Sequence, residues 1–589
     1  MDLENINITV LTQEQFKGAL SLQLPKLIKE YSDDKNGEIT IKIGEGDFFF
    51  DESCINLQDL QKEKLSIKII GEGDKTRIFA KGRVLKNDDE IENFNINTGF
   101  VTLEKAKEKK LGFFARLFKK ILRFFGKKEK KKEVIDFPSY FGRDFYFADK
   151  PIEVIDEELK LCKLYYKKLG NIFEVNPGIN DKYHYIQICQ WFKSNVYEIT
   201  SANLDEGFVV FKCNDLTYNT SKQDWSVNGH YFFSKKTIMP AFRLSSSDMP
   251  DVISVNPYVL LPEGVESVYS CENTCFLKIK NCAFRGFTIS GLTFMGNKDK
   301  LNESLINIEK TTFSNKLSLI QNTFNNIHSD VIKTLRVVNT EITSNTFYKC
   351  WRYGIYLVEN SHDLVSYNHF NDCGLASTNT HCIRVDSDDF IVSHNDLYNY
   401  GSTGITVGTW WASDDNVKTY GKVTSNVLRN SKGYKISLMD SGAIYVCTQN
   451  KKVIISENII DNYTGLMENR GIFCDDGAFG FELRDNIITN IPNSFSIDSW
   501  RAKYVETSPQ TKLKEPANTR NIISHNHIDG PIRYEGNESY MSPEKACVLE
   551  INYRKKKRSN NNPDIINNVI KNINSAESVE DGEVFIEED

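Results

Sequence analysis

A short phrase of polar and apolar residues recurs along more than half of the chain: an Asn, one variable residue, and then a large apolar residue. A fixed phrase separated by spacers of changing length is typical of a solenoid, in which each repeat forms one coil and insertions lie in the loops. The steps between phrases grow from 23 residues to 42. The phrase begins at Asn322, Asn345, Asn368, Asn395, Asn426, Asn458, Asn486, Asn526 and Asn568.

A second phrase, a small residue followed by Ile, lies between successive Asn phrases. Each coil therefore contains at least two short strands, rich in β-branched and aromatic residues and separated by Asn, Asp, Gly and Ser. We expect Asn at the turns, because it tolerates left-handed backbone conformations and can bond neighbouring backbone, and we expect identical residues to stack in ladders. The alternative fold is a propeller, whose blades should repeat every 40–50 residues throughout, whereas the steps in this chain are shorter and irregular. The small–Ile phrases are Gly354-Ile355, Cys382-Ile383, Gly404-Ile405, Ala443-Ile444, Gly471-Ile472 and Ser496-Ile497.

This arrangement predicts an all-β fold, a parallel β-helix, and over residues 275–572 it resembles the right-handed parallel β-helix (pectin-lyase-like) superfamily. The resemblance implies a helix that caps the N-terminal end of the solenoid. Residues 13–31 have a helical pattern, and they precede strand-like segments at residues 39–43 and 66–70. The sequence thus predicts a helical cap followed by the first coils.

Five parts are expected along the chain, on the basis of where the phrases stop and the composition changes. They are the N-terminal cap and first β-helix coils at 1–100, a basic amphipathic helical insertion at 101–135, a β-rich insertion at 136–250, the main parallel β-helix at 251–575, and an acidic, frayed tail at 576–589.

The composition of the chain limits the classes of protein to which it can belong. The chain has 589 residues, a net charge of −7 and 13 Cys, an odd number without C-x-x-C pairs. Such cysteines are typical of buried thiols in a reducing compartment. The N-terminus lacks the basic and apolar regions of a signal peptide, and no apolar run is long enough to span a bilayer. We therefore expect a cytoplasmic protein without a nucleic-acid-binding module or a resident cofactor.

Residues 104–133 have a different character, with 13 basic and 4 acidic residues around a Phe-rich stretch. On a helical wheel the apolar residues cover one half and the basic residues the other. This combination predicts a helix that lies in an anionic membrane surface, through residues 105–132, on the inner face of the membrane. Packing of this helix on the solenoid and binding of a partner protein are the alternatives. The predicted membrane-binding residues are Phe113, Phe114, Leu117, Phe118, Ile121, Phe124 and Phe125.

Aligning the coils on the small–Ile phrase places other residues in columns, since alternate residues of a strand face opposite sides. If Ile points inward, the outward column is Tyr356, Arg384, Thr406, Tyr445, Phe473 and Asp498. A second outward column, two residues further along, contains Asp386, Asp475 and Trp500. We expect an exposed aromatic floor with carboxylates, in which sugar rings stack on Tyr445, Phe473 and Trp500 and two acids act across a glycosidic bond.

Two local phrases, Asp440-Ser-Gly-Ala-Ile-Tyr445 and Gly471-Ile-Phe-Cys-Asp-Asp-Gly477, resemble phrases of β-helix glycoside hydrolases such as those of family 141. The resemblance implies catalytic or substrate-binding roles for Asp440, Asp475 and Asp476. The predicted catalytic residues are Asp440, Asp475, Asp476 and Asp498, and the predicted substrate-binding residues are Arg384, Asp386, Tyr445, Phe473, Trp500 and Arg501.

The preferred function is a glycoside hydrolase that binds a polysaccharide or glycan in a lateral groove. A second hypothesis is a polysaccharide lyase or uronate epimerase, built on Arg384 with His381, Asp386, Asp388 and Asp389; only this hypothesis calls for Ca²⁺. The third is a membrane-associated glycan-binding or scaffold protein without catalysis. For each Asp, the alternative to a functional role is a structural one, in which the side chain caps a turn and accepts from backbone amides. The sugar, the linkage and the oligomeric state do not follow from the sequence.

Overall fold

The computed structural model describes residues 5–32, 35–50, 54–80, 82–85, 146–147, 153–156, 158–165, 185–190, 193–203, 208–212, 216–219, 224–227, 230–232, 241–245, 258–259, 267–270, 275–297, 304–327, 329–374, 380–408, 418–430, 441–447, 449–463, 470–475, 478–491, 495–500, 522–530, 532–535, 548–553 and 584–588. The chain divides into two compact units, residues 1–82, 191–193 and 270–589 in one and residues 83–190 and 194–269 in the other.

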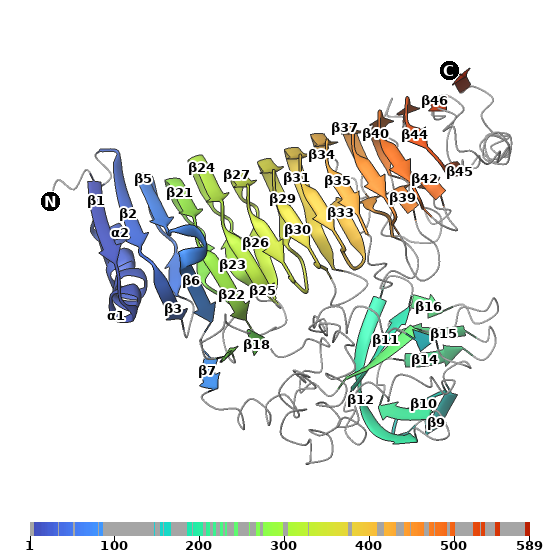
Figure 1. The fold of residues 1–589 in the computed structure, drawn as a ribbon, viewed down its shortest axis with the longest axis horizontal. Helices are drawn as coiled ribbons and strands as arrows, with labels where there is room; N and C mark the ends of the chain where they lie inside the picture. The colour runs from blue at the N-terminus through green and yellow to red at the C-terminus, as the bar shows by residue number, and fades with distance from the viewer. Residues whose placement is uncertain are drawn as a thin grey trace, which may run out of the picture. The chain divides into compact units, whose positions relative to one another are not determined.

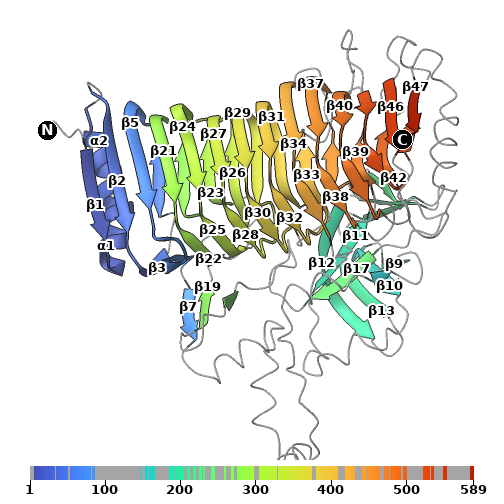
Figure 2. The same cartoon turned by 45° about the horizontal axis from the view of Figure 1, so that its top comes forward.

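The first unit is a solenoid whose coils contribute strands to three parallel faces, and Figures 1 and 2 show the strands of successive coils side by side. We define face 1 as the stack that carries the small–Ile phrase. Its strands are β4 (Ile55–Gln58), β20 (Leu277–Lys280), β23 (Ser304–Glu309), β26 (Asp330–Leu335), the first halves of β29 (Ile355–Ser366) and β31 (His381–Ser393), β33 (Thr403–Val407), β36 (Ile444–Val446), β39 (Arg470–Cys474), β42 (Phe495–Trp500) and β45 (Ile532–Glu535).

Face 2 follows face 1 in each coil, and face 3 carries the Asn phrase. Face 2 consists of β1 (Asn5–Val10), β2 (Gly37–Ile43), β5 (Gln61–Ile70), β21 (Ala283–Ser290), β24 (Thr312–Ile320), β27 (Val338–Thr343), the second halves of β29 and β31, β34 (Lys418–Thr424), β37 (Gln449–Ser456), β40 (Phe479–Arg484), β43 (Ile522–Ser524), β46 (Val548–Tyr553) and β47 (Val584–Glu588). Face 3 consists of β3 (Gly46–Phe50), β6 (Thr76–Ala80), β22 (Thr293–Asn297), β25 (Thr323–Ile327), β28 (Thr346–Tyr348), β30 (His369–Asn371), β32 (Asp396–Tyr398), β35 (Val427–Arg429), β38 (Ile459–Asp461), β41 (Ile487–Thr489) and β44 (His527–Ile528).

The predicted helical cap is confirmed. Residues 13–30 are helical without a break, as α1 (Gln13–Lys17), the π-helical turn Gly18–Gln23 and α2 (Leu24–Glu30). The helix begins at a capping box, in which Thr12 accepts from the backbone of Gln15 and Gln15 bonds back. Its buried residues, Phe16, Leu20, Leu24 and Ile28, belong to the same apolar core as the coils and so cover its N-terminal end.

The solenoid is interrupted between two adjacent coils. β4, β5 and β6 pair in register with β20, β21 and β22, although nearly 200 residues separate the two sets in sequence. The intervening unit is antiparallel. Its larger sheet has the order β8 (Tyr146–Phe147), β17 (Ala241–Ser245), β11 (Tyr185–Gln190), β12 (Lys193–Asn203), β13 (Phe208–Lys212), β10 (Leu161–Tyr165) and β9 (Glu153–Asp156).

Two small sheets complete this unit: β14 (Leu216–Asn219), β15 (Asp224–Val227) and β16 (His230–Phe232) in one, and β18 (Tyr258–Val259), β19 (Ser267–Ser270) and β7 (Gly82–Leu85) in the other. Among the described residues, the strands of the β-helix resume at Leu277. The expected acidic tail differs from the prediction, since Val584–Glu588 pairs with β46 as one more parallel strand.

A ladder of buried asparagines joins the coils at the start of face 3. From Asn322 to Asn486, each backbone N–H and each side-chain Nδ2 donates to the Oδ1 of the next ladder Asn, at 2.9–3.1 Å, and Asn526 is the last acceptor. Nδ2 also donates to a backbone carbonyl of an earlier coil, as Asn395 does to Val365. Stacking of identical residues is thereby confirmed for eight of the nine phrases, and Asn568 lies outside the described residues.

Asn was predicted at this turn for two reasons. Its bonding to neighbouring backbone is confirmed, but the left-handed backbone conformation is not at the Asn itself. In the described chain the residue with positive φ is the one immediately before each ladder Asn: Gln321, Ser344, Tyr367, His394, Ser425, Glu457, Asp485 and His525. Asn is required for its amide, which supplies a donor and an acceptor to neighbouring coils, and not for left-handed backbone.

The apolar residue of the Asn phrase fills the core beneath the ladder. Phe294, Phe324, Phe347 and Phe370 form a continuous stack, with ring centroids 4.3–5.2 Å apart. The small residue of the other phrase packs against this column. A Cβ on Gly354 would lie 2.7 Å from the Phe370 ring and from the carbonyl oxygen of Cys382, so the close approach requires glycine.

We predict that Asn395→Ala lowers the free energy of unfolding by about 3 kcal/mol, because it leaves the buried N–H of Asn368 and the carbonyl of Val365 without their partners. Chemical denaturation monitored by circular dichroism measures this change. The control is Asn56→Ala, at an exposed position of β4, which should change stability little. Equal effects of the two substitutions would contradict a structural role for the ladder.

Candidate functional site

The predicted outward column of face 1 is present in the predicted register. Tyr356 pairs with Arg384, Arg384 with Thr406, Thr406 with Tyr445, Tyr445 with Phe473 and Phe473 with Asp498. The inward neighbours Ile355, Ile383, Ile405, Ile444, Ile472 and Ile497 are all closed to solvent. The columns predicted from the small–Ile phrase therefore describe the sheet correctly.

The predicted exposure of this column is wrong. Tyr356 is half-buried, but Arg384, Tyr445, Phe473 and Asp498 are 3%, 7%, 0% and 0% exposed. Alternation along a strand shows which residues leave the core; it does not show what covers them outside. Tyr445 and Phe473 consequently form no open aromatic floor, and they pack edge to face with ring centroids 5.5 Å apart.

Asp498 is held in a buried ion pair. Its carboxylate accepts from Nε of Arg470 at 2.5 Å, and the Arg470 guanidinium lies 4.0 Å from the centre of the Phe473 ring. Both side chains of the pair are almost without solvent contact. This geometry fits a residue that positions Arg470, and it argues against Asp498 as an acid that meets substrate.

Arg470 was missed by the sequence reasoning. It stands directly before the Gly471-Ile472 phrase, at the first residue of β39, and it is among the largest fully buried side chains of the described chain. The signal that could have revealed Arg470 is its place directly before a small–Ile phrase, because a cation that is buried there needs a buried anion nearby.

Asp475 keeps partial contact with solvent. It is half-buried, at the end of β39, and its Oδ2 accepts from the Tyr445 hydroxyl at 2.8 Å. Its backbone carbonyl accepts from the N–H of Ala478, so the chain turns directly after it. Of the four predicted acids, Asp475 is thus the one whose described surroundings combine partial exposure with a specific hydrogen bond.

A second cluster on the same face surrounds Arg384. Its guanidinium lies 5.0 Å from the centre of the Tyr356 ring, which stacks on Tyr353 with centroids 4.7 Å apart. His381 contacts the edge of the Tyr353 ring, and its Nδ1 lies 2.8 Å from the hydroxyl of Thr406.

Burial controls the protonation of this cluster. It raises the pKa of Tyr353, an effect that the neighbouring Arg384 partly offsets, so Tyr353 carries a neutral hydroxyl. Burial, together with the positive charge of Arg384, holds the pKa of His381 well below its usual value, so the imidazole is neutral at pH 7.

The charged residues that were predicted to gather around Arg384 lie on two different faces of the solenoid. Asp386 is buried on face 1 and interacts with Arg384 through its charge. Asp389 pairs instead with His362 at 2.8 Å, at exposed positions of the face 2 half of the strands. Arg384, Asp386, Asp388 and Asp389 therefore do not form one site.

Several predicted residues lie outside the described part of the chain: Asp440, Asp476, Arg501, the side chain of Trp500, and the whole basic segment with Phe113, Phe114, Leu117, Phe118, Ile121, Phe124 and Phe125. Within the described residues there is no group of three or more His, Cys, Asp and Glu that could hold a metal ion. None of the described helices is long and apolar enough to cross a membrane. The nine cysteines whose side chains the structure describes are buried free thiols.

We predict that Arg470→Met costs about 3–5 kcal/mol of stability, since it leaves the Asp498 carboxylate buried without its cation. Thermal unfolding of the full chain measures the loss. Arg336→Met is the matched control, because the Arg336–Glu359 pair is exposed on both sides and should contribute less than about 1 kcal/mol. The double variant Arg470→Met/Asp498→Leu should recover much of the loss; a double variant as unstable as the single one would contradict the pairing.

The match to a family model agrees with this architecture. Residues 264–446 match a family model described as a right handed beta helix region. Among solved structures, the chain is similar to one titled "Glycoside hydrolase", with 12% identity, a TM-score of 0.48 and coverage of 84% of this chain and 94% of that chain. It is also similar to the tailspike protein gp49 from Pseudomonas phage LKA1, with 8% identity, a TM-score of 0.20 and coverage of 90% and 70%.

No curated protein matches the chain. The three stacked parallel faces and the matched region together identify the chain as a right-handed parallel β-helix protein.

Proposed function

We propose that the chain is a carbohydrate-active β-helix protein that binds a polysaccharide along face 1 and hydrolyses its glycosidic bonds. The observation that carries this proposal is the half-buried Asp475, whose carboxylate accepts from the Tyr445 hydroxyl. A carboxylate in partial contact with solvent and fixed by one hydrogen bond suits a general base, a general acid or a nucleophile.

Glycoside hydrolysis needs a second carboxyl group, and its distance from the first decides between retention and inversion. Asp440 and Asp476 are the candidates for this second acid, on the strength of the sequence phrases alone. Asp498 and Arg470 support the site from beneath, since they fix Phe473 between β36 and β42. In this proposal Asp498 is a positioning residue.

A polysaccharide lyase is the second candidate, and the Arg384 cluster favours it. Tyr353 carries a neutral hydroxyl within reach of the Arg384 guanidinium, so it can give its proton to the glycosidic oxygen that leaves, while the neutral imidazole of His381 can take the proton from the sugar carbon next to the carboxylate. Products separate the two activities, because hydrolysis adds water and elimination leaves a carbon–carbon double bond that absorbs ultraviolet light.

We predict that Asp475→Asn lowers kcat for polysaccharide hydrolysis by at least about 100-fold, because the amide still accepts from Tyr445 but can neither take up nor give a proton. Release of reducing ends from a panel of polysaccharides measures the rate. Asp485→Asn, at an exposed turn after β40, is the control and should retain full activity.

The hydrolase assignment fails if Asp475→Asn cleaves as fast as the unchanged chain. If cleavage yields unsaturated ends and persists in Asp475→Asn, the activity is that of a lyase and its site is the Arg384 cluster. Tight binding of a polysaccharide without any cleavage leaves the non-enzymatic glycan-binding function.

A further inference from the structure

Polar side chains interrupt the apolar core at the corner between faces 1 and 2. One inward column of face 2 runs through Phe287, Leu317, Thr340, Asp363 and Phe390, which pair in register on successive coils. Of these five residues only Thr340 and Asp363 are polar, and they are 2% and 3% exposed. The alternation of the strands therefore directs a carboxyl group into the interior of the solenoid.

Three more buried polar side chains lie on the same coils. Thr334 interrupts an inward column of face 1, in which its partners in register are Ile308 and Leu357. Asn360 and Ser387 pair with each other where β29 and β31 pass from face 1 to face 2. All three polar side chains are at most 4% exposed. We call the five buried polar residues the polar corner: Thr334, Thr340, Asn360, Asp363 and Ser387.

Hydrogen bonds satisfy only part of the polar corner. Asn360 accepts from the backbone N–H of Val337 at 3.0 Å, and its Nδ2 donates to the Thr334 hydroxyl at 2.6 Å. Among the described residues, in contrast, neither carboxylate oxygen of Asp363 nor the hydroxyl oxygen of Thr340 has a partner in hydrogen-bonding geometry. The polar corner thus gathers several oxygen atoms in the core without pairing them.

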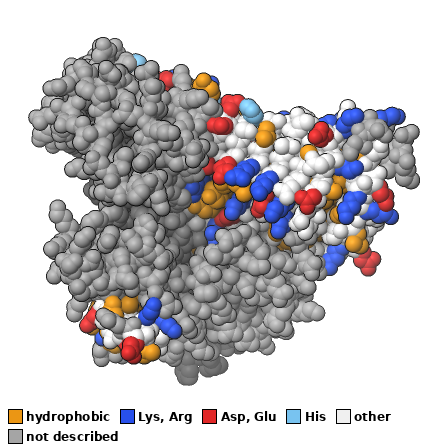
Figure 3. Space-filling view, turned by 180° about the vertical axis from the view of Figure 1, so that it is seen from behind, with side chains coloured by type: hydrophobic (Ala, Val, Ile, Leu, Met, Phe, Trp, Pro, Cys, Tyr) orange, Lys and Arg blue, Asp and Glu red, His pale blue; other side chains and the backbone are white. Residues whose placement is uncertain are grey.

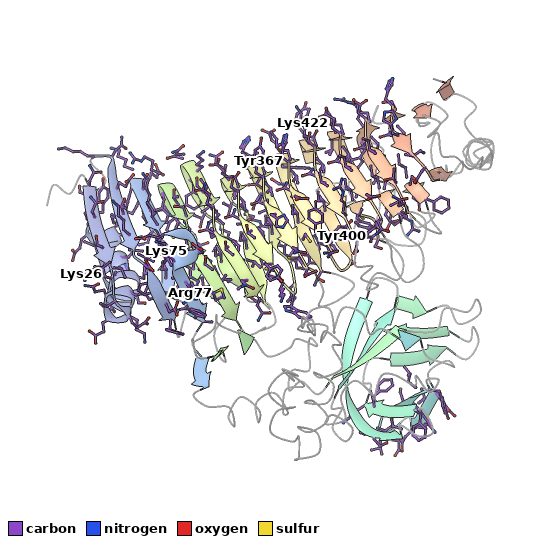
Figure 4. All side chains as sticks on the ribbon, viewed as in Figure 1. Lys26, Lys75, Arg77, Tyr367, Tyr400 and Lys422 are labelled. Atoms are coloured by element: carbon purple, nitrogen blue, oxygen red, sulfur yellow. The ribbon has the colours of Figure 1, made fainter. Side chains whose placement is uncertain are left out.

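The carboxyl group of the polar corner has no basic partner in the described chain. Burial raises the pKa of Asp363 to about 6, and the nearby Ser387, Thr340 and Asn360, all neutral, offset this rise only in part. At pH 8 the group is therefore ionised. Water does not compensate its charge, since Asp363 is buried, whereas Tyr367 on the same coil, labelled in Figure 4, is 61% exposed. A buried charge without a partner is costly.

We propose that the polar corner binds a monovalent metal cation, Na⁺ or K⁺, between the coils that carry β27, β29 and β31. Carboxylate and hydroxyl oxygens are the ligands that hard cations prefer. One carboxylate neutralises one positive charge, whereas a divalent ion would leave a net charge in the core. The ligand set differs from the clusters of acids, histidines or cysteines that hold divalent metals, which the described residues do not contain.

The ion joins the coils that carry the Arg384 cluster. Tyr356 lies on β29 and Arg384 on β31, and each strand continues through the polar corner to face 2. Contacts of one ion with Thr340, Asp363 and Ser387 connect three successive coils at this corner. Binding of the ion stabilises these coils whether or not face 1 cleaves a sugar.

The test compares melting temperatures of the full chain at pH 8 in sodium, potassium and choline chloride of equal concentration, because choline is too large for a buried site. We expect Na⁺ or K⁺ to raise the melting temperature by about 2 °C or more, in a saturable manner. Asp363→Asn keeps the size of the side chain and removes its charge, so it should abolish the difference between the salts. Asp389→Asn, at an exposed position of β31, is the matched control and should retain the difference.

A second variant tests a neutral ligand of the ion. Thr340→Val removes one hydroxyl group and should raise the half-saturating concentration of the cation about tenfold or more while the chain still folds. Stability of Asp363→Asn in choline chloride equal to or above that of the unchanged chain supports the proposal, because an amide needs no counter-ion.

Equal melting temperatures of the unchanged chain in the three salts would overturn the proposal. So would a cation effect that persists in Asp363→Asn, an unchanged half-saturating concentration in Thr340→Val, or stabilisation by Ca²⁺ and not by Na⁺ or K⁺.

Discussion

Each coil of the solenoid is locked to the next by a buried side-chain amide. The Oδ1 of a ladder Asn accepts from the backbone N–H and the side-chain Nδ2 of the preceding ladder Asn. Its own Nδ2 donates to a carbonyl of the preceding coil and to the Oδ1 of the next ladder Asn, so one residue bonds to the coil on either side of it. If a strand shifted by one residue, its ladder Asn would be displaced and several of these polar groups would lose their partners. Each lost partner costs about 1–3 kcal/mol. The ladder therefore sets the register of every strand that follows it.

The site depends on that register. Because the small–Ile phrase begins each strand of face 1 at the same point, residues far apart in sequence meet on adjacent coils: Tyr445 beside Phe473, and Phe473 beside Asp498. The same stacking places Lys333 beside Tyr356 and Tyr356 beside Arg384. Face 1 thus carries two outward columns of side chains, and the register brings residues of successive coils together along them. Figure 3 shows basic and acidic side chains interspersed over the described surface that is seen from behind.

The sequence predicted the coils, the helical cap at 13–31 and the outward column with its register, because each follows from a periodicity that the core imposes. It did not predict burial of Phe473 or Asp498, because strand alternation carries no information on what lies beyond the sheet. It also missed Arg470, whose partner Asp498 is 28 residues away and was interpreted as a catalytic acid. The conformation at the Asn turn was misjudged for a related reason: the residue before each Asn takes the left-handed backbone, and only the hydrogen bonds of the folded ladder reveal why.

The most direct measurement is a crystal structure of the full chain with a bound oligosaccharide, taken from a polysaccharide that the chain cleaves. The account predicts a sugar chain along face 1, parallel to the solenoid axis, with a glycosidic oxygen within hydrogen-bonding reach of Asp475. An oligosaccharide bound only at another face, or an Asp475 carboxylate that points away from the sugar, would contradict it.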